Sequence, residues 1–130
     1  MTITQIDAAR AGLVTPQMQR VAEKEGRDPE WIRERVAKGT IAIPANVNHT
    51  SLDAHGVGEG LRTKVNVNLG ISGDLHDEPE EWKKVDIAHE LGAEAIMDLS
   101  NAGKTRDFRR KLIQRSTAMI GTVPMYDVKG

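Results

Sequence analysis

The second half of the chain switches repeatedly between two spacings of apolar residues. Short apolar runs predict strands at 63–69, 94–99 and 117–123, and apolar residues at helical spacing predict helices at 79–91 and 105–115. Strands that alternate with helices of this length are typical of βαβ units and predict an α/β fold with a parallel sheet. Because parallel sheets bind ligands at the carboxyl ends of their strands, polar residues at those ends are candidates for a site.

The first predicted strand alternates apolar and polar residues, so that Lys64, Asn66 and Asn68 share one face. This spacing leaves two interpretations open. In an edge strand the polar face meets solvent, whereas in a barrel it points inward toward a ligand. If the face is buried, its amides must bond to a ligand or to each other, because an unpaired polar group is costly to bury.

The other two strand ends supply further candidates. Asp98 and Ser100 stand where the second strand meets its loop, and they are suited to polar contacts. Met97 precedes them; a methionine there is usually a core residue, but its place near the carboxyl end keeps a role in a site open. Tyr126 follows the third strand in a loop.

The helix predicted at 79–91 has a capping box, formed by Asp77 and Glu80, before its first apolar residue. Its apolar residues lie three apart, which is the spacing of an amphipathic helix. The buried stripe that this spacing predicts consists of Trp82, Val85, Ala88 and Leu91.

Residues 1–43 are predicted to be mainly helical, with a short strand at 41–43. Two helices each begin with an N-cap residue followed by proline and end about ten residues later at a glycine. The two sets of signals are Thr15-Pro16 with Gly26, and Asp28-Pro29 with Gly39.

Residues 44–62 have no sustained period and are rich in Asn, His and Gly. A loop of this length in a compact domain is usually functional or disordered. His49 and His55 are possible ligands or bases, but neither has an acidic or histidine partner at metal-site spacing. We expect a helical domain with its glycine-rich loop at 1–62 and the start of the sheet domain at 63–130.

Composition narrows the classes of function. The 130 residues carry a net charge of −1, which gives no overall attraction to nucleic acid or membrane. There is no cysteine, so the chain holds no disulfide, thiolate nucleophile or iron–sulfur ligand. No apolar run approaches the roughly 20 residues that span a bilayer, and the amino terminus lacks the pattern of a signal peptide. We expect a cytoplasmic protein.

Three strands and two crossovers do not complete a parallel sheet, because both faces of such a sheet need cover. We expect the chain to be the first part of a larger α/β protein, or one piece of a two-chain assembly.

Four strings of the sequence resemble the phosphomethylpyrimidine synthase family: IPANVNH at 43–49, GVGEGLRTKVNVNLG at 56–70, AIMDLS at 95–100 and IGTVPMYD at 120–127. They occur in the family's order, and the resemblance covers essentially the whole chain. The family comprises radical S-adenosylmethionine enzymes that rearrange 5-aminoimidazole ribotide. The resemblance implies a small, mainly helical N-terminal domain followed by the first βαβαβ part of a (β/α)8 barrel.

The resemblance also implies substrate-binding residues. The second Asn of the K-x-N-x-N string is Asn68, the Met of MDLS is Met97, and the Tyr of TVP-x-Y is Tyr126. We expect Asn68 to bond the imidazole or ribose, Met97 to pack on the ring, and Tyr126 to bond the phosphate or ribose. Additional contacts are expected from Asn66, Asp98 and Ser100. The resemblance assigns no catalytic residue in this chain.

The cofactors implied by the resemblance are a [4Fe–4S] cluster, S-adenosylmethionine and a zinc-like divalent metal. We expect their ligands beyond Gly130, because a chain without cysteine cannot hold the cluster. The chain alone is therefore not expected to be active. It requires the remaining barrel and cluster-binding segment, in cis or as a second chain, and the family implies a homodimer.

Two branches of the family use the same substrate. One makes the pyrimidine phosphate of thiamin, and the other, 5-hydroxybenzimidazole synthase, makes a lower-ligand precursor of anaerobic cobamides. Thiamin enzymes usually read S-T-G after the MDL string, where this chain reads SNAGKT at 100–105, and Gln where this chain has Asp127. These departures favour the hydroxybenzimidazole branch, with the thiamin branch as the alternative. A non-catalytic homologue that binds a phosphoribosyl ligand or a partner chain is a further alternative.

Overall fold

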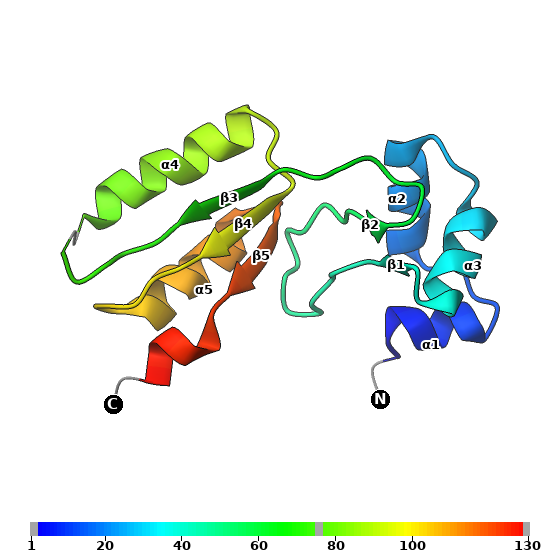
Figure 1. Ribbon diagram of the computed structural model, residues 1–130, viewed down its shortest axis with the longest axis horizontal. Helices are drawn as coiled ribbons and strands as arrows, with labels where there is room; N and C mark the ends of the chain where they lie inside the picture. Colours follow the sequence, from blue (N-terminus) through cyan, green and yellow to red (C-terminus); the bar gives the residue numbers. More distant parts are fainter. Residues whose placement is uncertain (1–2, 75–76, 129–130) are drawn as a thin grey trace. The chain divides into compact units, whose positions relative to one another are not determined.

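The computed structural model describes residues 3–74 and 77–128. The chain divides into two compact units, which are described separately (Figure 1). The first unit extends to Val47 and resumes at Asp53–Thr63. The second comprises the short segment Asn48–Leu52 and the chain from Lys64 onward. The division is therefore not a single cut in the sequence.

The first unit contains three helices, α1 (Gln5–Arg10), α2 (Pro16–Glu25) and α3 (Pro29–Lys38). The predicted signals of α2 and α3 are confirmed, because the side chains of Thr15 and Asp28 accept hydrogen bonds from backbone amides in the first turn. Gly26 and Gly39 end the two helices in the left-handed conformation. The core of this unit is formed by apolar side chains including Met18, Val21, Ile32, Val36 and Ile41.

A short antiparallel pair joins β1 (Ile41–Ala42) to β2 (Val57–Gly58). β2 lies within the segment predicted as a loop, and its two residues are too few to produce a period. Gly58 makes the pairing possible: a Cβ at this position would lie 2.1 Å from the carbonyl oxygen of Thr40, and its φ is +145°. A side chain is therefore excluded for two reasons.

The second unit is an α/β structure. Its elements are β3 (Asn66–Leu69), α4 (Glu78–Glu90), β4 (Ala95–Asp98), α5 (Thr105–Arg115), β5 (Met119–Thr122) and the 3-10 helix η1 (Pro124–Val128). The strands pair in the order β3-β4-β5, and both pairs are parallel. The predicted alternation of strands and helices and the parallel sheet are confirmed.

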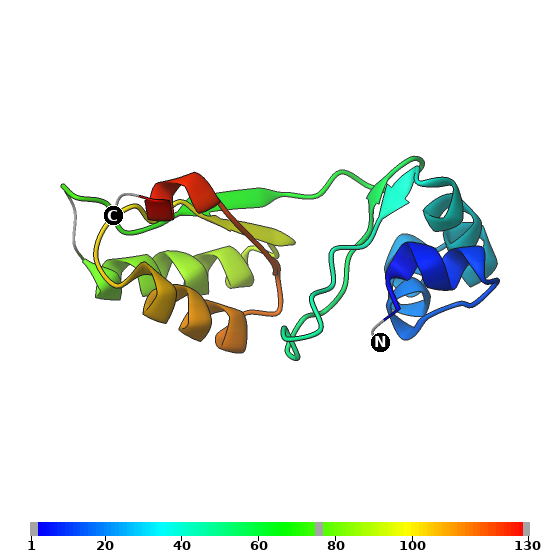
Figure 2. The ribbon, with the colours of Figure 1, turned by 90° about the horizontal axis from the view of Figure 1, so that it is seen from below.

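Both α-helices of this unit lie on the same face of the sheet (Figure 2). They pack against Leu69 and Ile96, in a core that also contains Val85, Phe108 and Leu112. Side chains alternate along a strand. The residues next to Leu69 in β3 and next to Ile96 in β4 therefore point to the face without helices.

The stripe predicted for α4 is confirmed in part. Val85 and Ala88 are buried and Trp82 is half-buried, but Leu91 is 82% exposed. The helix ends at Glu90, so that Leu91 is its C-cap and no longer follows the helical spacing.

Asn48–Leu52 belongs to the second unit because it caps the end of α5. His49 Nε2 donates to the carbonyl oxygen of Ser116 at 2.7 Å, and Ser51 Oγ donates to the same oxygen at 2.8 Å and to that of Ile113 at 3.1 Å. Carbonyls at the end of a helix lack partners within the helix, so these bonds satisfy them. His49 has a structural role here, which its sequence context did not indicate.

Candidate functional site

The candidate site lies at the carboxyl edge of the β3-β4-β5 sheet. Asn68 stands opposite Met97 in the pairing of β3 with β4, and Met97 stands opposite Gly121 in the pairing of β4 with β5. The three residues therefore form one row across the sheet, on the face without helices. Asn68 is exposed and Met97 is half-buried.

The two asparagines of β3 bond to each other. Asn66 Nδ2 donates to Asn68 Oδ1 at 2.8 Å, and both side chains are exposed. This bond occupies one acceptor position of Asn68 and does not use its own NH2 group, which carries two donors. The polar face thus meets solvent within this chain, and its two amides are linked by a hydrogen bond.

Met97 lies across Gly121. A Cβ built at Gly121 would be 2.8 Å from Met97 Cε and 2.9 Å from Sδ. The glycine leaves room for the thioether to lie flat on the sheet, where a methionine offers a soft apolar surface for a planar ring.

Asp98 and Ser100 are placed differently from Asn68 and Met97. Asp98 is fully buried on the helix-covered side, where Oδ1 accepts from the Ser100 amide and Oδ2 accepts from Arg109 Nε, each at 3.0 Å. Ser100 Oγ accepts from the amide of Ile71 at 3.0 Å. The structure therefore places both side chains in a network behind the row of Asn68 and Met97.

Tyr126 lies in η1, directly after β5, and is 43% exposed. It lines an open pocket of about 470 Å³ together with the β4–α5 loop and the first turn of α5, including Asn101, Gly103, Lys104 and Arg106. Asn68 and Met97 do not line this pocket. The structure thus brings Asn68 and Met97 together, whereas Tyr126 stands at the same edge beside a different loop. The side chain of Asp127 is outside the part of the chain that the structure describes.

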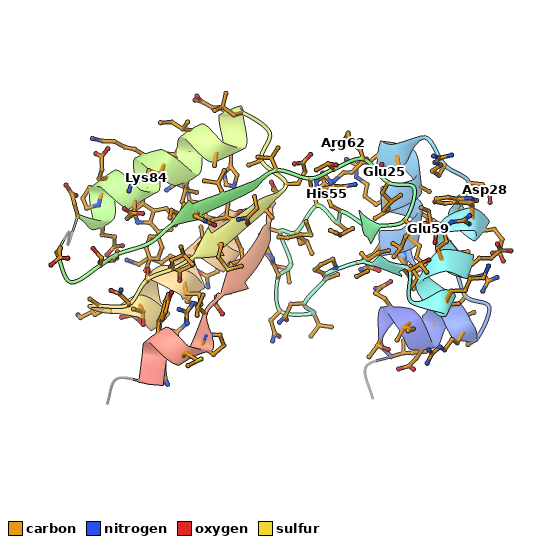
Figure 3. The ribbon with its side chains drawn as sticks, in the orientation of Figure 1. Glu25, Asp28, His55, Glu59, Arg62 and Lys84 are labelled. Carbon is orange, nitrogen blue, oxygen red and sulfur yellow. The ribbon has the colours of Figure 1, made fainter. Side chains whose placement is uncertain are left out.

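Glu81 is a residue of this edge that the sequence interpretation missed. Its side chain is 2% exposed; Oε2 accepts from the amide of Gly70 at 2.8 Å, and Oε1 accepts from Lys84 Nζ at 2.5 Å. Lys84 lies on α4 (Figure 3). A signal was present, because Glu81 is four residues before Val85 and thus on the buried face of α4.

The remaining histidine candidate, His55, lies in the first unit. Lys24 Nζ is 3.0 Å from His55 Nε2 and donates to the carbonyls of Asp53 and Ala54. Within this unit, the amide of Arg62 also donates to Glu25 Oε2, and Figure 3 shows both residues near His55. These contacts hold the segment Asp53–Thr63 against α2.

Asp53 carries the clearest electrostatic perturbation of the first unit. Arg20 binds its carboxylate through Nε at 2.7 Å and Nη2 at 3.2 Å, and Lys24 Nζ lies 2.8 Å away. The hydrogen bonds from Arg20, followed by those from Lys24, hold the pKa of the Asp53 carboxyl well below its ordinary value. The ion pair of Arg20 and Asp53 joins the segment Asp53–Thr63 to α2, and it is not part of the candidate site.

The chain does not fit an iron–sulfur cluster, which takes cysteine thiolates, because it has no cysteine. Residues 3–74 and 77–128 also contain no group of three His, Asp or Glu side chains that is arranged to hold a metal ion. Across the same ranges no helix has the length and apolar character to cross a membrane.

α/β enzymes with parallel sheets bind small molecules at the carboxyl ends of their strands, and the row of Asn68 and Met97 lies near that edge. Comparison with known proteins identifies the group. The sequence model of the radical SAM ThiC family matches residues 4–130, and the chain belongs to this family. The resemblance carried by the four sequence strings is thereby confirmed.

Curated relatives agree with this assignment. The chain is 65% identical over 127 residues to the phosphomethylpyrimidine synthase of Alkaliphilus metalliredigens, 61% to that of Finegoldia magna and 58% to that of Clostridioides difficile. Each match covers 98% of this chain but only 29% of the relative. The names of these relatives favour the thiamin branch over the hydroxybenzimidazole branch that the departures at 100–105 and Asp127 suggested.

Proposed function

We propose that this chain is the substrate-binding N-terminal part of a phosphomethylpyrimidine synthase, which converts 5-aminoimidazole ribotide to the hydroxymethylpyrimidine phosphate of thiamin. The observation that carries this proposal is the identity of 58–65% to relatives of that name over nearly the whole chain. The activity, substrate and partners of the complete protein remain part of the proposal, because the chain spans 29% of those relatives.

A (β/α)8 barrel is the architecture that the topology supports. The strands follow one another in sequence order, and both crossover helices lie on one face (Figure 2). A barrel adds each strand on the same side, and one βαβαβ half of a doubly wound sheet does the same, so it is the family resemblance that favours the barrel. In that arrangement the row of Asn68 and Met97 points into the barrel.

The free side of β3 also supports a larger structure. Val65, Ile87 and Leu91 are 58%, 54% and 82% exposed, and they line an apolar hollow of about 350 Å³ beside the β3 strand. All-parallel sheets are normally covered on both faces and continue at their edges. We infer that the rest of the barrel, in cis or as a second chain, covers this region, and that the complete protein forms a homodimer.

The proposed contacts follow from the chemistry of the row. The NH2 group of Asn68 suits an acceptor on the imidazole or ribose, and the thioether of Met97 suits the face of the imidazole ring. Tyr126 suits the ribose or phosphate, because its hydroxyl both donates and accepts. Asn66 supports Asn68 through their hydrogen bond.

The cluster, S-adenosylmethionine and divalent metal of the family are proposed to bind residues supplied by the remainder of the protein. This chain holds no cysteine to bind the cluster. Its proposed part in the reaction is to hold the substrate at the sheet edge.

A chimera tests the proposal. Residues 4–130 would replace the matching 127-residue segment of the Alkaliphilus metalliredigens enzyme, and the purified chimera would be assayed anaerobically with 5-aminoimidazole ribotide. Formation of the pyrimidine phosphate is the expected result. The unchanged enzyme is the matched control.

The other outcomes decide between the alternatives. Hydroxybenzimidazole as the product would assign the chain to the cobamide branch, to which the string at 100–105 points. No product from a folded, cluster-loaded chimera, when the unchanged enzyme is active, would indicate a non-catalytic homologue.

A further inference from the structure

We propose that Glu81 and Ser100 are positioning residues, which fix the ends of β3 and β4 and thereby orient Asn68 and Met97. The inference rests on the proposed aminoimidazole ribotide site and adds to it two side chains that do not touch the ligand. With Asp98, they form a set of buried polar groups that we call the edge brace.

Glu81 holds the chain where β3 ends. Glu81 lies on α4, and its carboxylate accepts a hydrogen bond of 2.8 Å from the backbone amide of Gly70. Gly70 is two residues after Asn68. Burial of a carboxylate is costly unless it is paired, and Glu81 is 2% exposed with Lys84 as its ionic partner. An apolar residue at this position on α4 would avoid that cost but would leave the Gly70 amide without its acceptor.

Ser100 holds the next residue of the same loop. Its hydroxyl accepts the amide of Ile71 at 3.0 Å, and its own amide donates to buried Asp98 at 3.0 Å. The amide of Asn101 donates to the carbonyl of Ile71, also at 3.0 Å. The loop after β3 is therefore hydrogen-bonded to the loop after β4 through both the amide and the carbonyl of Ile71.

Gly70 shows how closely the two loops approach. A Cβ at this position would lie 2.5 Å from the Ser100 nitrogen and 2.8 Å from the Leu99 carbonyl carbon, and its φ is +145°. Direct contact between backbones here leaves the loops little freedom. Asn68 lies two residues before Gly70, and Met97 lies two residues before Leu99. This backbone contact therefore restrains the positions of both residues.

The brace lies behind the site and not in it. Asp98 shares the helix-covered face with Leu69, its partner in the strand register, whereas Met97 lies on the opposite face. The side chains of Glu81 and Ser100 bond backbone amides, so that they act on a ligand only through the positions of Asn68 and Met97.

The test uses the whole chain, labelled with ¹³C in its methionine methyl groups and ¹⁵N in its side-chain amides. Three quantities are measured: the resonances of Met97 and Asn68 without ligand, the Kd for 5-aminoimidazole ribotide, and the Tm. The variants are Glu81→Leu, which removes the acceptor; Glu81→Gln, which keeps a carbonyl oxygen; and Ser100→Ala. Asp86→Asn, at an exposed carboxylate of the same helix that pairs with Arg115, is the matched control.

Glu81→Leu is expected to shift both resonances and to weaken binding about tenfold in the folded protein. Glu81→Gln should recover most of that affinity, Ser100→Ala should weaken binding several-fold, and Asp86→Asn should change none of these quantities. A lower Tm with unchanged resonances and unchanged Kd would overturn the proposal and leave a purely structural role.

Two further outcomes are also decisive. If Glu81→Leu does not fold, Ser100→Ala carries the test, since it removes a single hydroxyl. If the unaltered chain binds no aminoimidazole ribotide without the rest of the barrel, the resonances of the free chain still decide whether Glu81 positions Asn68 and Met97, and the chimera decides the proposed function.

Discussion

Asn66 donates a side-chain hydrogen bond of 2.8 Å to Asn68, so that the two polar residues of β3 behave as a pair. Amides next to each other on one face of a strand are free to rotate in solvent unless something holds them. The bond restrains Asn68 through its carbonyl oxygen, and it gives the two residues different expected effects on binding.

We expect Asn68→Ala to abolish the direct contact and to weaken aminoimidazole ribotide binding on the order of tenfold. Asn66→Ala should weaken it less, about two- to threefold, because it removes only the restraint on Asn68. Titration calorimetry on the whole chain measures both. An Asn66→Ala effect equal to or larger than that of Asn68→Ala would mean that Asn66 itself contacts the ligand.

Tyr126→Phe removes one hydroxyl from the pocket beside the β4–α5 loop. If this hydroxyl bonds the ribose or phosphate, the variant should weaken binding by about five- to tenfold without changing the Tm, since the side chain is 43% exposed. Met125→Leu, at a neighbouring residue that is 81% exposed, is the control. Unchanged binding by Tyr126→Phe would remove this residue from the site.

Gly121→Ala tests the placement of Met97. The new methyl group would lie 2.8 Å from Met97 Cε, and the end of that flexible side chain can move aside. We expect a loss of stability below about 1 kcal/mol but a displaced Met97 methyl resonance and weaker ligand binding. Gly73→Ala, where a Cβ meets no atom within 4 Å, should leave all three unchanged. An unmoved Met97 resonance in Gly121→Ala would contradict the packing.

The ion pair of Asp53 predicts an effect of acid on stability. Hydrogen bonds from Arg20, and then from Lys24, lower the pKa of the Asp53 carboxyl below its value of 3.8 in a model compound. A group with a lowered pKa in the folded state stabilises it above the unfolded pKa and loses this contribution as pH falls through the folded pKa.

Asp53→Asn should therefore be less stable than the unaltered chain at pH 7, and the difference should begin to shrink below about pH 4 and keep shrinking as the pH falls toward the folded pKa. The side chain of Asp53 is 42% exposed, so solvent screening limits the difference to about 1 kcal/mol or less. Urea unfolding at several pH values measures it. Arg20→Met should reproduce the same pH dependence, and a difference that is unchanged between pH 7 and pH 2.5 would show that packing and not charge is responsible.

Much of the fold was predictable because its signals are local. The cap at Thr15, the stop at Gly26 and the alternation of βαβ units depend on residues a few positions apart, and the structure has them as predicted. Position also placed Asn68 and Met97 at one edge, since the carboxyl ends of parallel strands meet there, and their register is as expected. Their role in substrate binding, which the family resemblance implies, stays a prediction.

The parts that sequence reasoning missed depend on contacts between distant segments. The spacing of α4 puts Glu81 on the buried face, but the reason that a charged residue is tolerated there appears only once Gly70, eleven positions earlier, presents its amide. His49 has no local partner, and its role appears only when Ser116, 67 positions later, ends a helix nearby. Leu91 was assigned to the buried stripe because spacing does not show that the helix ends one residue earlier.

The strap formed by Asn48–Leu52 has a practical consequence for dissecting this protein. A truncation that starts at residue 63 would remove His49 and Ser51, whose side chains donate hydrogen bonds to the carbonyl oxygen of Ser116 at the C-terminal end of α5. A piece that starts at residue 48 keeps them but carries with it the whole return loop. The chain thus enters this unit twice, so that a boundary that removes the first unit without harm to the second has to keep those five residues.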